Sequence, residues 1–174
     1  MRDNSNSNSY CLSATAVIQL ISGHKTRTMK FTGAKVIEKP RDEVVKYFAD
    51  PQYLGEYQDG FVRKDLVSGE AGQDGTVSKM FYSDGKRDME LTETIIANRL
   101  PETFEAEYHH KHMDNFMRCT FVALDDQRTR YEYEFEYTRI NWIMPKLIAI
   151  LFPSMYRNQG EKWMQQFKEF VEGQ

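Results

Sequence analysis

Residues 152–172 read FPSMYRNQGEKWMQQFKEFVE, and apolar side chains recur in this stretch at every third or fourth position. This spacing predicts one long amphipathic helix with a single apolar stripe. The stripe consists of Phe152, Met155, Tyr156, Gly160, Trp163, Met164, Phe167, Phe170 and Val171. A helix of this kind needs an apolar surface to pack against, and we expect that surface to be one face of a β-sheet.

Short segments of alternating polar and apolar residues precede this helix, as is typical of an antiparallel sheet. Turn signals such as Asp84-Gly85 and Asp125-Asp126 separate them. The segments span 61–68, 75–83, 86–97, 103–112, 116–124 and 129–138. A first strand over 30–38, a short helix over 40–50 and a helix or turn over 53–60 come before them. The order predicts an α+β domain with a sheet of about seven strands.

Two turns predict which side chains share a face of this sheet. A hairpin turn at Asp114-Asn115 places Tyr108 opposite Phe121, and the loop at 125–126 places Phe121 opposite Tyr133. Both give the same apolar inner face. It carries Tyr108, His110, Cys119, Phe121, Tyr131, Tyr133, Phe135 and Tyr137.

The segment 86–97 adds Met89, Leu91, Glu93 and Ile95 to the inner face. Glu93 is then a carboxylate on an apolar surface, where a charge needs a partner or a proton. One interpretation is that it pairs with an inner Lys or Arg, or extends to the sheet edge. The other is that it orients the polar end of a ligand or acts as an acid or base.

The histidine cluster at 109–112 resembles a metal motif, but only His110 and His112 would share a face of a strand. No Cys/His pair has zinc-site spacing, so we expect no metal and no cofactor. The same register puts His110 opposite Cys119. This is either a nucleophile–base pair or a packing cysteine beside a histidine. Glu93 and His110 are therefore the candidates for acid–base catalysis. These residues alone do not show that the chain is an enzyme.

Composition narrows the class of protein. The chain has 174 residues and a net charge of −3, which argues against nucleic acid as a partner. No apolar run is long enough to span a membrane. The run 142–152 is interpreted as a lid, with a dimer contact or a transient membrane contact as alternatives. Cys11 and Cys119 are the only cysteines, which favours a reducing, cytoplasmic compartment. We expect a monomer or a weak homodimer.

Residues 1–9 read MRDNSNSNS, a polar low-complexity stretch. We expect residues 1–28 to form a flexible or weakly ordered extension and residues 29–172 to form the domain.

Three stretches resemble the START-like, or SRPBCC, superfamily: KPRDEVVKYFADPQYLGEY (39–57), MELTETIIANRLPETFEAEY (89–108) and EKWMQQFKEFVE (161–172). The resemblance implies a helix-grip fold, in which a curved antiparallel sheet wraps around the last helix. It also implies a deep cavity for a small hydrophobic ligand such as a lipid, an isoprenoid or a polyketide-like aromatic. A polyketide cyclase or dehydratase and a co-chaperone-like interaction module are the alternatives that the superfamily offers.

Combined with the inner face, the resemblance predicts a ligand pocket. Its residues are Met89, Leu91, Glu93, Tyr108, His110, Cys119, Phe121, Tyr131, Tyr133, Phe135, Tyr137, Tyr156, Gly160, Trp163 and Phe167. Gly160 interrupts the helix stripe, and a mid-helix glycine costs about 1 kcal/mol. Close packing or room for a ligand would explain it, and chance tolerance of a glycine at the surface is the alternative.

Overall fold

The computed structural model describes residues 29–140 and 153–174, with the side chains of the last helix described from residue 158. The strands are β1 (Met29–Ile37), β2 (Phe61–Ser68), β3 (Val77–Ser83), β4 (Asp88–Arg99), β5 (Thr103–His110), β6 (Met113–Ala123) and β7 (Thr129–Ile140). The helices are α2 (Arg41–Ala49), the 3-10 turn η1 (Pro51–Tyr53), α3 (Leu54–Tyr57) and α5 (Pro153–Glu172).

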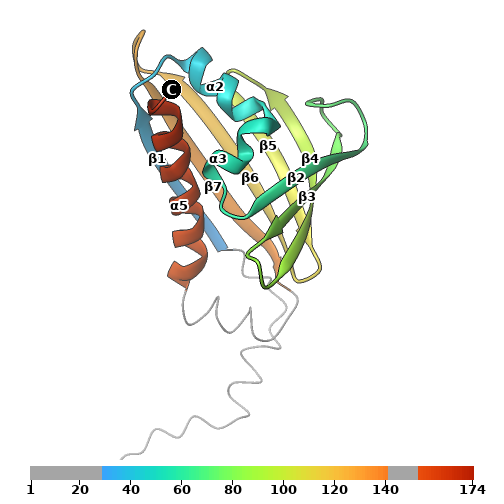
Figure 1. Ribbon diagram of the computed structural model, residues 1–174. Helices are drawn as coiled ribbons and strands as arrows, with labels where there is room; N and C mark the ends of the chain where they lie inside the picture. Colours follow the sequence, from blue (N-terminus) through green and yellow to red (C-terminus); the bar gives the residue numbers. More distant parts are fainter. Residues whose placement is uncertain (1–28, 141–152) are drawn as a thin grey trace, which may run out of the picture.

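The seven strands form one antiparallel sheet in the order β1-β7-β6-β5-β4-β3-β2. The sheet curls, and α5 lies inside the curl along β1 and β7 (Figure 1). Helix α3 contacts both α5 and β2, so the short helices join the last helix to the far edge of the sheet. The predicted α+β helix-grip architecture is confirmed, and most element boundaries lie within about three residues of their predicted positions.

The predicted register of the β5–β6 hairpin was wrong. The turn lies at residues 111–112 and not at 114–115, so Tyr108 pairs with Asn115 and not with Phe121. This partner is six residues away from the predicted one. Because six is an even number, every side chain stays on its predicted face.

The β6–β7 register was also displaced, by two residues. Phe121 pairs with Tyr131 and not with Tyr133, and the even displacement again preserves the faces. The paired part of β6 and β7 is longer than predicted and brings Asp114 beside Arg139. Arg139 donates hydrogen bonds to both carboxylate oxygens of Asp114. His109 Nδ1 lies 2.6 Å from Asp114 Oδ1 on the same surface. These contacts favour Asp114 in a strand, where the sequence suggested a turn.

The hydrophobic core fills one part of the space inside the curl. Phe167 of α5 contacts the rings of Phe48, Tyr57 and Tyr131, with centroid separations of 6.0, 4.8 and 5.5 Å. Phe121 stacks on Tyr131 at 4.9 Å. The C-terminal half of α5 is therefore tightly packed, and this packing fixes the position of the helix over β1 and β7.

Several predictions lie outside the described residues. They concern the extension 1–28 and Cys11 within it, the run 142–152, and the side chain of Tyr156. The division of the chain into 1–28 and 29–172 stays a prediction. Across residues 29–140 and 153–174 we find no helix with the length and hydropathy of a membrane span.

Candidate ligand cavity

A cavity of about 1430 Å³ lies between the concave face of the sheet, α3 and the middle of α5, from Gln159 to Phe167. Its walls include most of the pocket residues that the sequence predicts. These are Met89, Leu91, Glu93, Tyr108, His110, Tyr131, Tyr133, Phe135, Tyr137, Gly160, Trp163 and Phe167. Cys119 and Phe121 do not line it: both are fully buried in the adjoining core, at 0% and 1% exposure.

Gly160 lets α5 approach the sheet closely. A Cβ atom at this position would lie 3.1 Å from Cε2 of Phe135, which is tighter than an ordinary van der Waals contact. Gly160 also borders the cavity. Close packing therefore accounts for this mid-helix glycine, at the point where packed core gives way to open volume.

Sequence reasoning missed the methionines of the wall. Met80, Met89, Met113, Met117 and Met164 line the cavity, and of these only Met89 was among the predicted pocket residues. Methionine is unbranched and polarizable, so it adapts to ligands of different shape. The total of nine methionines in the chain was the available signal, but composition does not say where they gather.

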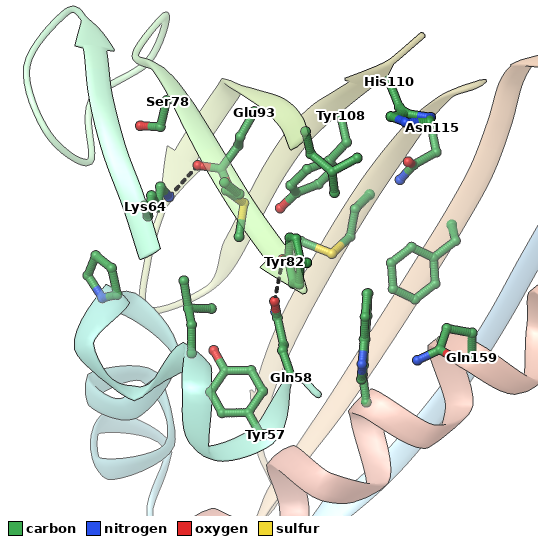
Figure 2. Close-up of a pocket in the computed structure, with 18 of the residues that line it drawn as sticks. Tyr57, Gln58, Lys64, Ser78, Tyr82, Glu93, Tyr108, His110, Asn115 and Gln159 are labelled. Carbon is green, nitrogen blue, oxygen red and sulfur yellow. Dashed lines mark hydrogen bonds and ion pairs between the residues drawn. The ribbon is translucent and has the colours of Figure 1, made fainter. Parts of the chain in front are cut away.

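One end of the cavity is polar. Lys64 of β2 and Glu93 of β4 form an ion pair through Lys64 Nζ and Glu93 Oε1, drawn as a dashed line in Figure 2. The Glu93 side chain is 5% exposed and that of Lys64 is 19% exposed. The two residues lie on strands separated by β3, where Ser78 is the direct neighbour of Glu93. The interpretation that Glu93 pairs with an inner basic residue is confirmed.

Three tyrosines labelled in Figure 2 line the same cavity: Tyr82 and Tyr108 to one side of the ion pair, and Tyr57 further away near α3. Burial, followed by the negative charge of Glu93, raises the pKa of Tyr82 and of Tyr108. The pKa of Tyr57 is raised mainly by burial, with a smaller contribution from Glu93. All three phenols therefore stay protonated at neutral pH. We call Lys64, Glu93 and these tyrosines the polar end of the cavity.

Gln58 extends the polar end toward the helices. Tyr82 donates a hydrogen bond to Gln58 Oε1 at 2.6 Å, and its ring stacks on Trp163 of α5 at 6.1 Å. The indole Nε1 of Trp163 is buried and has no hydrogen-bond partner among the described residues. Trp163 thus contributes an apolar surface and an unused donor to the same wall.

Comparison with known proteins gives similarity in structure and none in sequence. No family model matches the chain, and no curated protein matches it. Among solved structures, Ara h 8.0201 is 12% identical to this chain with a TM-score of 0.67. The match covers 84% of this chain and 99% of the Ara h 8.0201 chain. The Zhui aromatase/cyclase from Streptomyces sp. R1128 is 10% identical with a TM-score of 0.66, covering 83% of this chain and 94% of its own. Truncated norcoclaurine synthase from Thalictrum flavum is 14% identical with a TM-score of 0.62, covering 83% and 93%.

The chain has the helix-grip fold of the START-like proteins. At these identities the similarity concerns the fold alone, so the chemistry has to be read from the side chains of this helix-grip cavity.

His110 lies where β5 ends, at the hairpin side of the helix-grip cavity. Its ring centroid is 5.2 Å from that of His112. Partial burial lowers its pKa, and the neighbouring His112 and Lys111 lower it further. His110 is therefore neutral at physiological pH.

The predicted pairing of His110 with Cys119 was wrong. His110 pairs with Met113 across the hairpin, whereas Cys119 pairs with Phe104. The Cys119 thiol lies 3.1 Å from the Tyr131 hydroxyl, and burial raises its pKa to about 12. A thiol that stays protonated is a poor nucleophile, so Cys119 is a core residue.

Metal binding finds no support in the described part of the chain. Over residues 29–140 and 153–174, no group of three or more His, Cys, Asp or Glu side chains is arranged to hold a metal ion. His109 lies beside Asp114 and Arg139 on the outer surface, whereas the rings of His110 and His112 contact each other.

Proposed function

We propose that the protein binds a small hydrophobic ligand in the helix-grip cavity. The observation that carries this proposal is the cavity of about 1430 Å³, which has mainly apolar and aromatic walls and a buried ion pair in its wall. Ligand pockets for drug-sized molecules measure roughly 300–1,000 Å³, so this one has room for a lipid, an isoprenoid or a polyketide-like aromatic. We place the protein in the cytoplasm as a monomer or weak homodimer that does not bind nucleic acid.

A second candidate function is acid–base catalysis on such a ligand. It is favoured by the ion pair between Lys64 and Glu93 at the cavity wall, beside protonated tyrosines. Two of the structures with similar folds carry enzyme names, an aromatase/cyclase and a norcoclaurine synthase. Turnover that is lost in Glu93→Gln would favour this candidate over simple binding.

The third alternative, a co-chaperone-like interaction module, predicts a filled core. The open volume between the sheet and α5 supports ligand binding instead.

Native mass spectrometry of freshly purified protein tests the proposal directly, because a carrier should retain a bound small molecule. A matched pair of variants shows whether that ligand occupies the cavity. Leu91 lines the cavity, whereas its neighbour Glu90 is exposed on the outer face. We expect Leu91→Trp to reduce binding of a hydrophobic fluorescent dye by about tenfold, or ~1.4 kcal/mol.

Glu90→Trp adds the same indole on the opposite face and should leave dye affinity within about twofold of the original. Absence of any bound molecule, together with no dye binding by the original protein, would reject the proposed function.

A further inference from the structure

We propose that the ion pair of Lys64 and Glu93 selects ligands with a neutral polar end group, a hydroxyl or a carbonyl, over ligands that end in a carboxylate. This inference rests on the proposed ligand binding and adds to it the chemical class of the ligand. It follows from which atoms of the polar end can reach a ligand and from their summed charge.

The polar end offers hydrogen-bond donors to a ligand. A lysine ammonium has three N–H donors, and among the described residues Glu93 is the only hydrogen-bond partner of Lys64 Nζ. Lys64 lines the cavity and keeps 19% of its side chain exposed, whereas Glu93 keeps 5%. Both side chains line the cavity, so a ligand at this end can reach the remaining N–H donors of the ammonium.

Lys64 and Glu93 together carry no net charge, so the polar end is electrically balanced before any ligand arrives. A carboxylate ligand would add a negative charge close to Glu93, where surrounding apolar walls strengthen the repulsion. It would also lose its hydration without gaining an unpaired cation in return. A hydroxyl or carbonyl oxygen can accept a hydrogen bond from Lys64 without disturbing this balance.

The titratable groups near the ion pair add no charge at neutral pH. The phenols of Tyr57, Tyr82 and Tyr108 remain protonated because their pKa values are raised, so they add hydroxyl groups and no charge. At the hairpin side of the cavity the pKa of His110 is lowered, so this imidazole supplies no cation at neutral pH.

The charged residues on the cavity rim are either exposed or paired. Lys111 and Asp88 line the cavity and are exposed, so water and salt screen their charges. Asp59 pairs with Lys162, and Asp84 pairs with Arg87. These pairs are half-exposed or more, so water and salt screen their charges. Among the described residues of the polar end, Lys64 is the one cation, and Glu93 already neutralises its charge.

Three fluorescent probes that share one pyrene-butyl tail test this selectivity: pyrenebutanol, pyrenebutyrate and pyrenebutylamine. Binding to the full-length protein is measured by titration at pH 7. We expect pyrenebutanol to bind about tenfold more tightly than pyrenebutyrate. Glu93→Gln leaves the Lys64 charge unbalanced and should reverse this order in favour of pyrenebutyrate. Lys64→Met leaves the Glu93 charge unbalanced and should favour pyrenebutylamine.

Glu90→Gln removes an exposed carboxylate from the same strand and serves as the matched control, which should keep the original order of affinities. Equal affinity of the original protein for pyrenebutanol and pyrenebutyrate would overturn the selectivity. This result needs no variant, so it holds even if a variant fails to fold. It would leave the proposed function, binding of a hydrophobic ligand, standing. Failure of all three probes to bind, with no retained molecule in native mass spectrometry, would overturn the proposed function and this inference with it.

Discussion

Breaking the Lys64–Glu93 pair should cost far more stability than replacing both of its members. Lys64→Met leaves the Glu93 carboxylate, 5% exposed, without its partner. Removal of one member of a buried pair costs about 3–5 kcal/mol, whereas replacement of both by apolar residues is often neutral or stabilising. Because Lys64 retains 19% exposure, we expect the lower end of that range, about 3 kcal/mol, for Lys64→Met. The double variant Lys64→Met/Glu93→Leu should lie within about 1 kcal/mol of the original protein.

Thermal unfolding followed by circular dichroism measures these differences. At about 2–4 °C per kcal/mol for a domain of this size, Lys64→Met should lower Tm by about 6–12 °C. The pair Lys79–Glu90 joins the same residue types on the outer face of β3 and β4, where both side chains are roughly half exposed. Lys79→Met should therefore cost less than about 1 kcal/mol. If Lys64→Met proves as mild as Lys79→Met, the inner pair is hydrated and the description of the polar end is wrong.

Three further predictions concern the thiol, the tyrosines and the helix glycine. In a Cys11→Ser background, Cys119 should react with an alkylating reagent only after the protein is unfolded by urea. The reason is that Cys119 is buried and its pKa is raised to about 12. Rapid labelling of the folded protein would contradict this burial. The three tyrosines of the polar end have raised pKa values, so the stability they contribute is complete below about pH 10 and is lost as pH rises above it. In urea titrations above about pH 10, Tyr57→Phe should reduce the fall in unfolding free energy by up to about 1.4 kcal/mol per pH unit. An unchanged slope of unfolding free energy against pH would argue against a buried phenol. Gly160→Val should destabilise by about 1–3 kcal/mol through overpacking, whereas Gln159→Val, at an exposed helix position, should cost less than about 1 kcal/mol in the same unfolding assay.

Alternation along each strand predicted the two faces of the sheet correctly even where the pairing was wrong. Tyr108 and Phe121 both lie on the inner face, although they are not partners. The reason is that burial of apolar side chains fixes the parity of the register, and a slip of one residue would expose a whole face. Slips of two or six residues keep that parity, so local patterns cannot exclude them.

Turn position depended on contacts that are distant in sequence. Asp114-Asn115 is a good local turn signal, yet Asp114 lies in β6 because Arg139, 25 residues later, binds its carboxylate. The candidate site shows the same dependence. Glu93 could be recognised from the sequence as a carboxylate that needs a partner, but its partner Lys64 lies on a strand two positions away in the sheet.

The sequence by itself determined the order of elements, the amphipathic last helix and the side chains that face inward, because these depend on periodicities of two and 3.6 residues along the chain. Only the tertiary structure decided which inward side chains meet and which enclose open volume. Phe121 and Tyr133 were equivalent in the sequence pattern, yet one is packed in the core and the other also borders the cavity. That distinction depends on how far the sheet curls away from α5, a property of the whole sheet that no single segment encodes.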